Sequence, residues 1–425
     1  MKEALLQIAW MHRLYDDLIC SHEVEVIDPG THNPNAGADF FSAKIKIDGI
    51  LWVGDVELHL HTRGWRAHRH NEDDGYTSVI LHVAIEGDDE VYDCRGRLIP
   101  SARLVLPDSL ENKAARLTEH ACGCYSHPQL GKLLGQIDHT ELFRRMLDER
   151  LEARVGNWVT LLDECQSDYV EVFHRLLFRY FGFGLNNDTM ERLARSIPAR
   201  AIIKQGDRLS QIEAMLLGQA GMLEDLPQGE AYVRELRREY EHLQAKYELK
   251  PLERSLFRTC RTRPSSFPMR RLLQLALLLH RTHLLSSRVL EVSNRDDLLQ
   301  LFRQEGKDSF WAAYFGYYRG ASLTLSAEAC VSLGINVVSV YQLILARLRP
   351  DLAHLSGRAM ALLSSLPAEN NAIIRKFRSL GFTPQSASDS QALLELYKSY
   401  CQRRKCLYCP IGRHMLAVPA TERGF

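Results

Sequence analysis

Hydrophobic and polar positions divide the chain into two kinds of pattern. After an opening segment with a helical apolar period, residues up to about 130 alternate as strands do, whereas the chain from about Asp138 onward runs in helical periods. The alternating part predicts a strand at 23–27, a hairpin of 42–47 and 50–61, and a buried strand at 78–86. Asp48-Gly49 suits the hairpin turn because both residues tolerate a left-handed backbone. This order of elements predicts an α/β N-terminal domain with a mixed sheet.

The helical part predicts helices such as 188–196, 209–223, 230–247, 269–285 and 367–381. The last of these starts with Pro367, which a first helical turn tolerates, and ends before Gly381, which suits a C-terminal cap. We therefore expect an α/β domain at 1–130, a large all-α domain at 138–385, and a C-terminal helix with a Cys-rich tail at 386–425.

Composition is that of an ordinary folded protein, with 45% hydrophobic and 25% charged residues. Uninterrupted apolar runs such as 275–279 are far shorter than the roughly 20 residues that a membrane-spanning helix needs. The N-terminus lacks the cationic flank and apolar core of a signal peptide. We expect a cytoplasmic protein without a membrane partner. The 10 cysteines are too sparse for a disulfide scaffold and are expected to be thiols or ligands.

The zero net charge hides an asymmetry between the two parts of the chain. Residues 1–130 carry 12 Lys and Arg against 21 Asp and Glu, and the remainder carries 41 against 32. The segment 254–271 holds six Arg and no acidic residue. Such a run can neutralise phosphates, which would make nucleic acid a partner, or it can pair internally with the acidic part. Both interpretations stay open, and the oligomeric state is not indicated.

A first candidate site lies in GDVELHLHTRGWRAHRHNEDDGY, residues 54–76. Glu57 and His59 are two positions apart on the predicted strand, so they share one face of it. Asp39, in GADF before the first hairpin strand, can meet Glu57 across the hairpin. Two carboxylates on adjacent strands suit a hard cation, Mg²⁺ or Mn²⁺, beside a phosphate. The sequence therefore predicts a metal site at Asp39 and Glu57.

The histidines of this stretch are candidates for proton transfer. We expect Glu57, His59, His68 and His70 to form the catalytic set, with the histidines accepting or donating protons near neutral pH. The alternative is a solvated polar loop between two strands. His82, within the buried strand, is expected to be a hydrogen-bonded core histidine, and Trp65 is expected to close an edge of the core.

The sequences AGADF and VELH resemble the motif of the PD-(D/E)XK nuclease superfamily over residues 24–86. The resemblance implies a core of helix, three strands, helix and strand, with Asp39 and Glu57 holding the ion of a nuclease. His59 stands where the family has Lys, and it cannot supply the same fixed charge. Two functions follow: a metal-dependent nuclease or phosphodiesterase-like enzyme acting on nucleic acid, or a non-catalytic scaffold that binds nucleic acid or protein.

A wider resemblance covers nearly the whole chain. The phrases FGFGLNNDTMERLARSIP, QIEAMLLGQAGML and LPAENNAIIRKF are similar to those of a bacterial family of unknown function. No activity is established for that family, so the resemblance implies membership and nothing about chemistry.

A second candidate metal site lies in the tail. Cys401, Cys406 and Cys409 have C-x4-C-x2-C spacing, and His414 follows. With His414 as fourth ligand, the set suits a structural zinc ion. The same spacing occurs in plant-type iron–sulfur sites, which would need another Cys, such as Cys122 or Cys124. Buried reduced thiols that only pack in the tail are the remaining interpretation.

Overall fold

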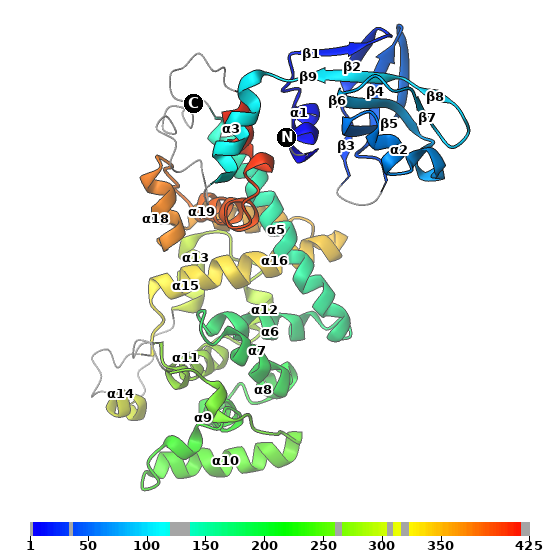
Figure 1. Cartoon of the computed structure of the whole chain (residues 1–425). Coiled ribbons are helices and arrows are strands. Elements are labelled where there is room, and N and C mark those ends of the chain that lie inside the picture. The colour runs from blue at the N-terminus through cyan, green and yellow to red at the C-terminus, as the bar shows by residue number, and fades with distance from the viewer. Residues whose placement is uncertain are drawn as a thin grey trace. The chain divides into compact units, whose positions relative to one another are not determined.

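The computed structural model describes residues 3–33, 37–119, 137–259, 266–303, 309–315 and 323–417. Contacts within the chain define two compact units (Figure 1). The first comprises Met1–Leu142, Arg375–Phe382 and Leu394–Phe425, and the second comprises Phe143–Ile374 and Thr383–Leu393. A mixed sheet followed by a large helical region confirms the predicted fold class. The tail was predicted to be a separate segment, but these contacts place its residues 394–425 in the first unit.

The first unit is built on a seven-stranded sheet with the order β1-β9-β6-β5-β4-β2, and β3 pairs with β4. β5 runs parallel to β6, and β6 runs parallel to β9, while the other pairs in this sheet are antiparallel. A separate ribbon joins β7 to β8. The strands are β1 (Asp17–Cys20), β2 (Val24–Asp28), β3 (Thr31–His32), β4 (Phe40–Ile47), β5 (Ile50–His61), β6 (Val79–Glu86), β7 (Val91–Tyr92), β8 (Leu98–Ile99) and β9 (Ser101–Val105).

The predicted hairpin is confirmed. β4 and β5 pair as antiparallel neighbours around Asp48 and Gly49, whose φ angles of 51° and 79° are the left-handed pair of a two-residue turn. β6 is buried over most of its length, as its continuous apolar sequence predicted. The sequence pattern did not predict β1 or β9, because both are short and β1 lies half exposed at the edge of the sheet.

Helices of the first unit pack on this sheet or beside it. α1 (Glu3–His12) contacts β5 and buries Leu5, Leu6 and Ile8. The connection from β5 to β6 consists of α2 (Gly64–Ala67) and two 3-10 turns at His70–Glu72 and Asp74–Tyr76. α3 (Asp108–Glu119) contacts α20 (Pro410–Ala417) and the 3-10 turn Cys406–Tyr408. The tail therefore packs within the first unit.

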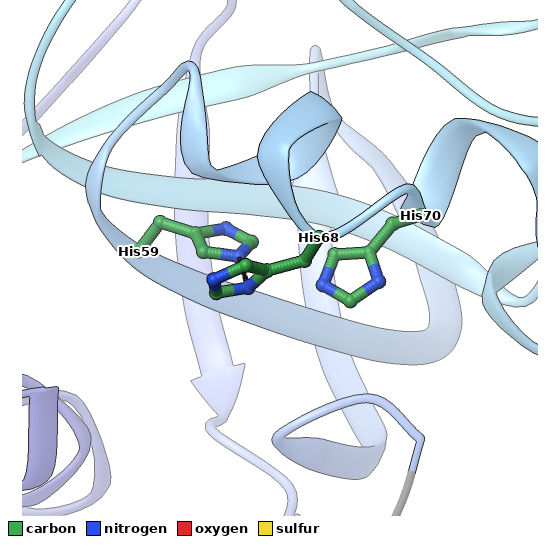
Figure 2. Close-up of side chains that lie close together, drawn as sticks. All are labelled: His59, His68 and His70. Carbon is green, nitrogen blue, oxygen red and sulfur yellow. Dashed lines mark hydrogen bonds between the residues drawn. The ribbon is translucent and has the colours of Figure 1, made fainter.

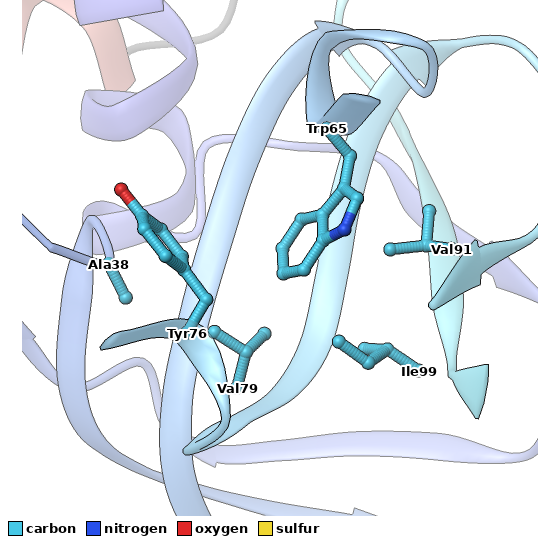
Figure 3. Packing of buried hydrophobic residues seen from close by; sticks show 6 residues of the cluster. All are labelled: Ala38, Trp65, Tyr76, Val79, Val91 and Ile99. Atoms are coloured by element: carbon cyan, nitrogen blue, oxygen red, sulfur yellow. The ribbon is translucent and has the colours of Figure 1, made fainter. Parts of the chain in front are cut away.

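Trp65 is the centre of a small apolar core beneath the β5–β6 connection. It is 1% exposed and lies among Ala38, Tyr76, Val79, Val91 and Ile99 (Figure 3). Its Nε1 donates a hydrogen bond of 2.9 Å to the carbonyl oxygen of Tyr92. This contact satisfies the one polar atom of the indole, so the connection is anchored as a packed layer of the core. Trp65 closes the core as the sequence predicted.

The second unit is built mainly of helices in its described residues. Its helices include α5 (His139–Glu164), which begins in the first unit, α6 (Tyr169–Phe181), α7 (Asn187–Ser196), α8 (Ala199–Lys204), α9 (Leu209–Gln219), α10 (Ala231–Tyr247), α11 (Pro268–Arg281), α12 (Leu285–Arg288), α13 (Arg295–Phe302), α14 (Ser309–Phe315), α15 (Ala327–Leu333), α16 (Ser339–Leu348), α17 (Leu355–Ser365), α18 (Ala372–Ser379) and α19 (Ala387–Glu395), the last two of which also extend into the first unit.

Local signals explain several of these helix ends. Asp168 caps α6 by accepting hydrogen bonds from the backbone N–H groups of Val170 and Glu171. Gly381 follows α18 with a φ angle of 98°, which confirms the predicted glycine after this helix. The predicted start of that helix at Pro367 was wrong. α18 begins at Ala372, and Pro367 forms a β-bridge with Ser386 instead.

One continuous helical stretch, Ala327–Leu348, is long and apolar enough to cross a membrane by length and composition. In the structure, 72% of its most apolar window is buried inside the protein. A π-helical turn at Gly334–Val338 interrupts it, and a Cβ atom on Gly334 would come within 2.6 Å of Leu298 Cδ2. The stretch packs closely against α13, as a core helix does.

Replacing Trp65 with Ala is expected to destabilise the first unit by about 3–5 kcal/mol, because the change leaves a cavity under the β5–β6 connection. Chemical denaturation followed by circular dichroism measures the loss. Trp52→Ala is the matched control, since Trp52 is 45% exposed, and it should cost less than about 1 kcal/mol. Equal losses in the two variants would show that Trp65 is not a core anchor.

Candidate metal centre

Three histidines converge where the β5–β6 connection crosses the sheet. His59 comes from β5, whereas His68 directly follows α2 and His70 begins the next 3-10 turn. Each can offer one ring nitrogen such that the three nitrogens all lie within 4.8 Å of one another. Figure 2 shows the three rings gathered between the strand and the turn. His59 and His70 are buried and His68 is exposed, so the cluster reaches the surface on the His68 side.

One separation between ring nitrogens is close to that of two ligands on one tetrahedral ion. His59 Nε2 lies 3.2 Å from His68 Nδ1. Two nitrogens bound to one tetrahedral ion at 2.0–2.1 Å lie about 3.3–3.4 Å apart. His70 is 8% exposed, and its Nε2 atom is buried without a hydrogen-bond partner. An unpaired buried nitrogen is costly, and an ion bound to it would remove that cost.

Glu57 lies next to this group. Its Oε1 is 3.3 Å from His70 Nε2 and 3.7 Å from His59 Nε2. The contact with His70 is close in distance but does not have the geometry of a hydrogen bond. The other carboxylate oxygen, Oε2, accepts a 2.9 Å hydrogen bond from the backbone N–H of Asp39. Oε1 is therefore the Glu57 oxygen that faces the histidines.

Asp39 is held beside Glu57 by its own hydrogen bonds. Oδ1 accepts from Gln7 Nε2 at 2.7 Å, and Oδ2 accepts from the backbone N–H of Leu58 at 3.0 Å. Both oxygens are thus engaged by α1 and β5. Burial and the adjacent Glu57 carboxylate raise the pKa of Asp39 to about 7, against partial opposition from these hydrogen bonds.

A row of polar side chains continues from this group across the sheet. The parallel register sets Glu57 opposite His82 and His82 opposite Ser101. His82 Nε2 lies 3.0 Å from His59 Nδ1, and His82 Nδ1 lies 2.8 Å from Ser101 Oγ. His82 is fully buried and uses both ring nitrogens, as expected of a hydrogen-bonded core histidine. The chain Ser101–His82–His59–His68 runs from β9 to the surface.

The local backbone explains how residues two apart in sequence can face the same point. Arg69, between His68 and His70, has a left-handed backbone with φ 61°. This conformation is uncommon for a residue with a side chain and reverses the chain locally. Gly64 allows the close approach of α2, because a Cβ atom there would come within 2.6 Å of His59 Cδ2. Tyr76 stacks on His70 with ring centroids 3.8 Å apart.

Burial favours the neutral form of His59 and of its neighbour His82. Burial, followed by the influence of His82, His70 and His68, lowers the pKa of His59 to about 3. Burial and His70 lower the pKa of His82 to about 4. Only an unprotonated ring nitrogen can bind a metal ion, so these shifts favour ligation at neutral pH.

The structure brings together Asp39, Glu57, His59, His68 and His70, the five residues singled out in the N-terminal sequence. Glu57 and His59 lie on one face of β5, as predicted. The connection that carries His68 and His70 covers this face. Sequence reasoning missed Ser101 and the partnership of His82 with His59. Only the parallel register reveals them, because β5, β6 and β9 are separated in sequence.

The second candidate site is arranged differently. Cys401, Cys406 and Cys409 are buried. Among the described residues, they and His414 do not form a group whose ligand atoms all lie within 4.8 Å of one another. Cys122 and Cys124 lie outside the described residues. A zinc ion or iron–sulfur cluster at the tail stays a prediction.

The basic run at 254–271 is only partly described, since residues 260–265 lie outside the described ranges. Arg254 pairs with Asp225, so part of this charge is used within the second unit. The guanidinium of Arg271 stacks 4.0 Å from the centre of the Phe183 ring. A role of this run in binding nucleic acid stays a prediction.

The fold and the centre define a protein whose first unit carries a histidine-rich cluster on a mixed sheet, followed by a large helical region. The chain belongs to the family described as "Protein of unknown function (DUF2851)", whose model matches residues 3–372. This confirms the wider resemblance noted in the sequence. Comparison with curated proteins found no match, and neither did comparison with solved structures.

Asp39→Asn is expected to change how stability depends on pH in the metal-free protein. The pKa of Asp39 is raised from 3.8 to about 7, so its contribution to stability is complete below pH 3.8 and is lost as pH rises through 7. The variant should therefore gain stability relative to the wild type between pH 4 and 7, at most about 1.4 kcal/mol per pH unit. Denaturant unfolding at a series of pH values in chelator measures this. A pH-independent difference would contradict it.

Cys406→Ser tests the tail site. If the tail holds a zinc ion, the variant should contain about one equivalent less metal than the wild type and should lose its last residues to protease first. Elemental analysis and limited proteolysis provide the measurements. The control is Cys165→Ser, a buried thiol of the second unit. Unchanged metal content and protease resistance in Cys406→Ser would mean that the tail cysteines only pack.

Proposed function

We propose that the first unit is a metal-dependent hydrolase that cleaves phosphodiester bonds of nucleic acid. The observation that carries the proposal is the convergence of His59, His68 and His70 on one point beside the Glu57 carboxylate. Three protein ligands and one open position are the usual arrangement of a catalytic metal site, whereas structural sites are closed by four.

Each residue of the centre would have a role that follows from its chemistry. The three imidazoles would hold the ion, and the exposed side at His68 would leave a position open to water and substrate. The ion would polarise the phosphate and lower the pKa of a water molecule. Glu57 Oε1, which faces the histidines, is placed to take the proton from that water. Asp39 would position Glu57 through its backbone N–H.

The reaction is a hydrolysis at phosphorus. The oxygen of water forms a bond to phosphorus while the P–O ester bond breaks. Glu57 receives the proton that water loses, and the leaving oxygen takes up a proton from solvent. The products are a phosphomonoester and an alcohol. The roles differ from those in the resemblance to PD-(D/E)XK nucleases, because histidines and not Asp39 hold the ion.

Three exposed arginines of the β5–β6 connection support an anionic substrate. Arg63, Arg66 and Arg69 are exposed on the same short segment that carries His68. Guanidinium groups bind phosphate in a bidentate manner, so this segment could hold the backbone of a nucleic acid next to the ion. A binding scaffold without catalysis would use the same arginines but would not need the unpaired nitrogen of His70.

The test is cleavage of labelled single-stranded and double-stranded oligonucleotides by the full chain with added Zn²⁺, Mn²⁺ or Mg²⁺. His68→Ala and Glu57→Gln are each expected to reduce the cleavage rate at least 100-fold, on the scale of a lost general base or metal ligand. His68 is exposed, so its removal should leave the fold intact.

His22→Ala is the control, because His22 is an exposed histidine of the same unit that pairs with Asp48. It should keep the wild-type rate. Cleavage that survives His68→Ala would overturn the proposal. Oligonucleotide binding without cleavage under all three metal conditions would replace it with the scaffold function.

A further inference from the structure

We propose that the centre is a nitrogen-ligand site for a borderline transition ion of the zinc class, and that His82 and Ser101 form the second layer that fixes its ligand His59. The inference deepens the proposed function, because it names the ion of the same site. It differs from the Mg²⁺ or Mn²⁺ site that the two carboxylates predicted from sequence.

The donor set decides the class of ion. Mg²⁺ requires oxygen ligands in a near-octahedral arrangement and retains several waters. Here three imidazole nitrogens point to one place, and the oxygens of Asp39 are taken by Gln7 and Leu58. Imidazole suits zinc and its neighbours among the transition ions, and the 3.2 Å spacing of His59 Nε2 and His68 Nδ1 fits a tetrahedral site.

The hydrogen bonds behind His59 follow the pattern of metal ligands. If Nε2 of His59 binds the ion, its proton must sit on Nδ1, which then donates to His82 Nε2 at 3.0 Å. His82 Nε2 is thereby the acceptor, so the proton of His82 sits on Nδ1 and donates to Ser101 Oγ at 2.8 Å. In this assignment both imidazole N–H groups of the row meet an acceptor, and Nε2 of His59 carries no proton.

The scaffold makes this second layer rigid. His82 is fully buried on β6, and Ser101 lies opposite it on β9 in the parallel register. Two of the three ligands come from the short connection above the sheet, whereas His59 comes from a central strand. His59, held by two buried strands, can define the position of the ion. His68 and His70 then complete the set of ligands.

The experiment is titration of the metal-free full chain with Co²⁺, whose visible absorption reports the number and type of ligands. The wild type is expected to bind one equivalent at this centre with the intense bands of a four- or five-coordinate site. A thousandfold excess of Mg²⁺ should leave the spectrum unchanged. His68→Ala should remove these bands and thereby separate this centre from any site in the tail.

Two variants of similar size test the second layer. His82→Leu removes the acceptor and should weaken Co²⁺ binding 10- to 100-fold with a shifted spectrum. His82→Gln keeps an acceptor for His59 and a donor for Ser101, and its affinity should stay within about threefold of the wild type. Thermal unfolding of the metal-free variants shows whether both fold, and Ser101→Ala should weaken binding less than His82→Leu.

The outcomes separate the two proposals. Equal affinity and identical spectra of the wild type and His82→Leu would overturn the second layer. Displacement of Co²⁺ by Mg²⁺, or cleavage supported by Mg²⁺ in a chain that binds no Co²⁺, would overturn the class of ion while leaving the proposed hydrolase intact. Tight Co²⁺ binding that depends on His82, together with no cleavage of any oligonucleotide, would support this inference and remove the proposed function.

Discussion

The parallel pairing of β5 with β6 is the constraint on which the first unit depends. A chain that leaves one strand and enters a parallel neighbour must cross back over the sheet, so a tight turn is impossible. Residues 62–78 make that crossing, and they do so with only α2 and two 3-10 turns. The crossing covers the face that carries Glu57 and His59. It also carries His68 and His70, so the connection and the candidate centre are the same piece of chain.

Covering that face buries an unusual number of polar groups at one place. Neutral imidazoles can be buried at moderate cost when their nitrogens are hydrogen-bonded, as those of His82 are. A buried carboxylate is more expensive, and a second carboxylate beside it adds to the cost, so burial first and Glu57 second raise the pKa of Asp39 to about 7. A divalent cation would offset this repulsion and satisfy His70 Nε2, which has no hydrogen-bond partner. The electrostatics and the placement of the ring nitrogens thus both support the divalent ion proposed for this centre.

The apolar layer above the sheet makes this arrangement rigid. Trp65 is buried between the crossing and the β7–β8 ribbon, with its indole N–H bound to the backbone of Tyr92. Tyr76 extends from this core to stack on His70. Ligand rings that are packed against aromatic side chains lose little further freedom when an ion binds, which favours affinity. The left-handed Arg69 is strained in isolation, and the packed residues on both sides of it hold it in place.

The sequence by itself determined the elements whose signals are local. Alternation and Asp48-Gly49 predicted the β4–β5 hairpin, the continuous apolar run predicted β6, and helical periods predicted most of the second unit, although the start of α18 was placed too early at Pro367. The grouping of Asp39, Glu57 and the histidines was also visible, because Asp39 directly precedes the first hairpin strand and the others lie on the second hairpin strand and in the segment after it. Membership of the family followed from phrases distributed along the whole chain.

Only the tertiary structure decided what those residues form together. Alternation placed Glu57 and His59 on one face but could not show that the next segment would fold over it, since that follows from the parallel pairing of distant strands. The same register, not any spacing in the sequence, places His82 and Ser101 behind His59. Spacing also suggested that the carboxylates would hold an ion. The hydrogen bonds of Asp39 and the convergence of three ring nitrogens shift that expectation to the histidines, because ligand geometry is a property of three-dimensional distances.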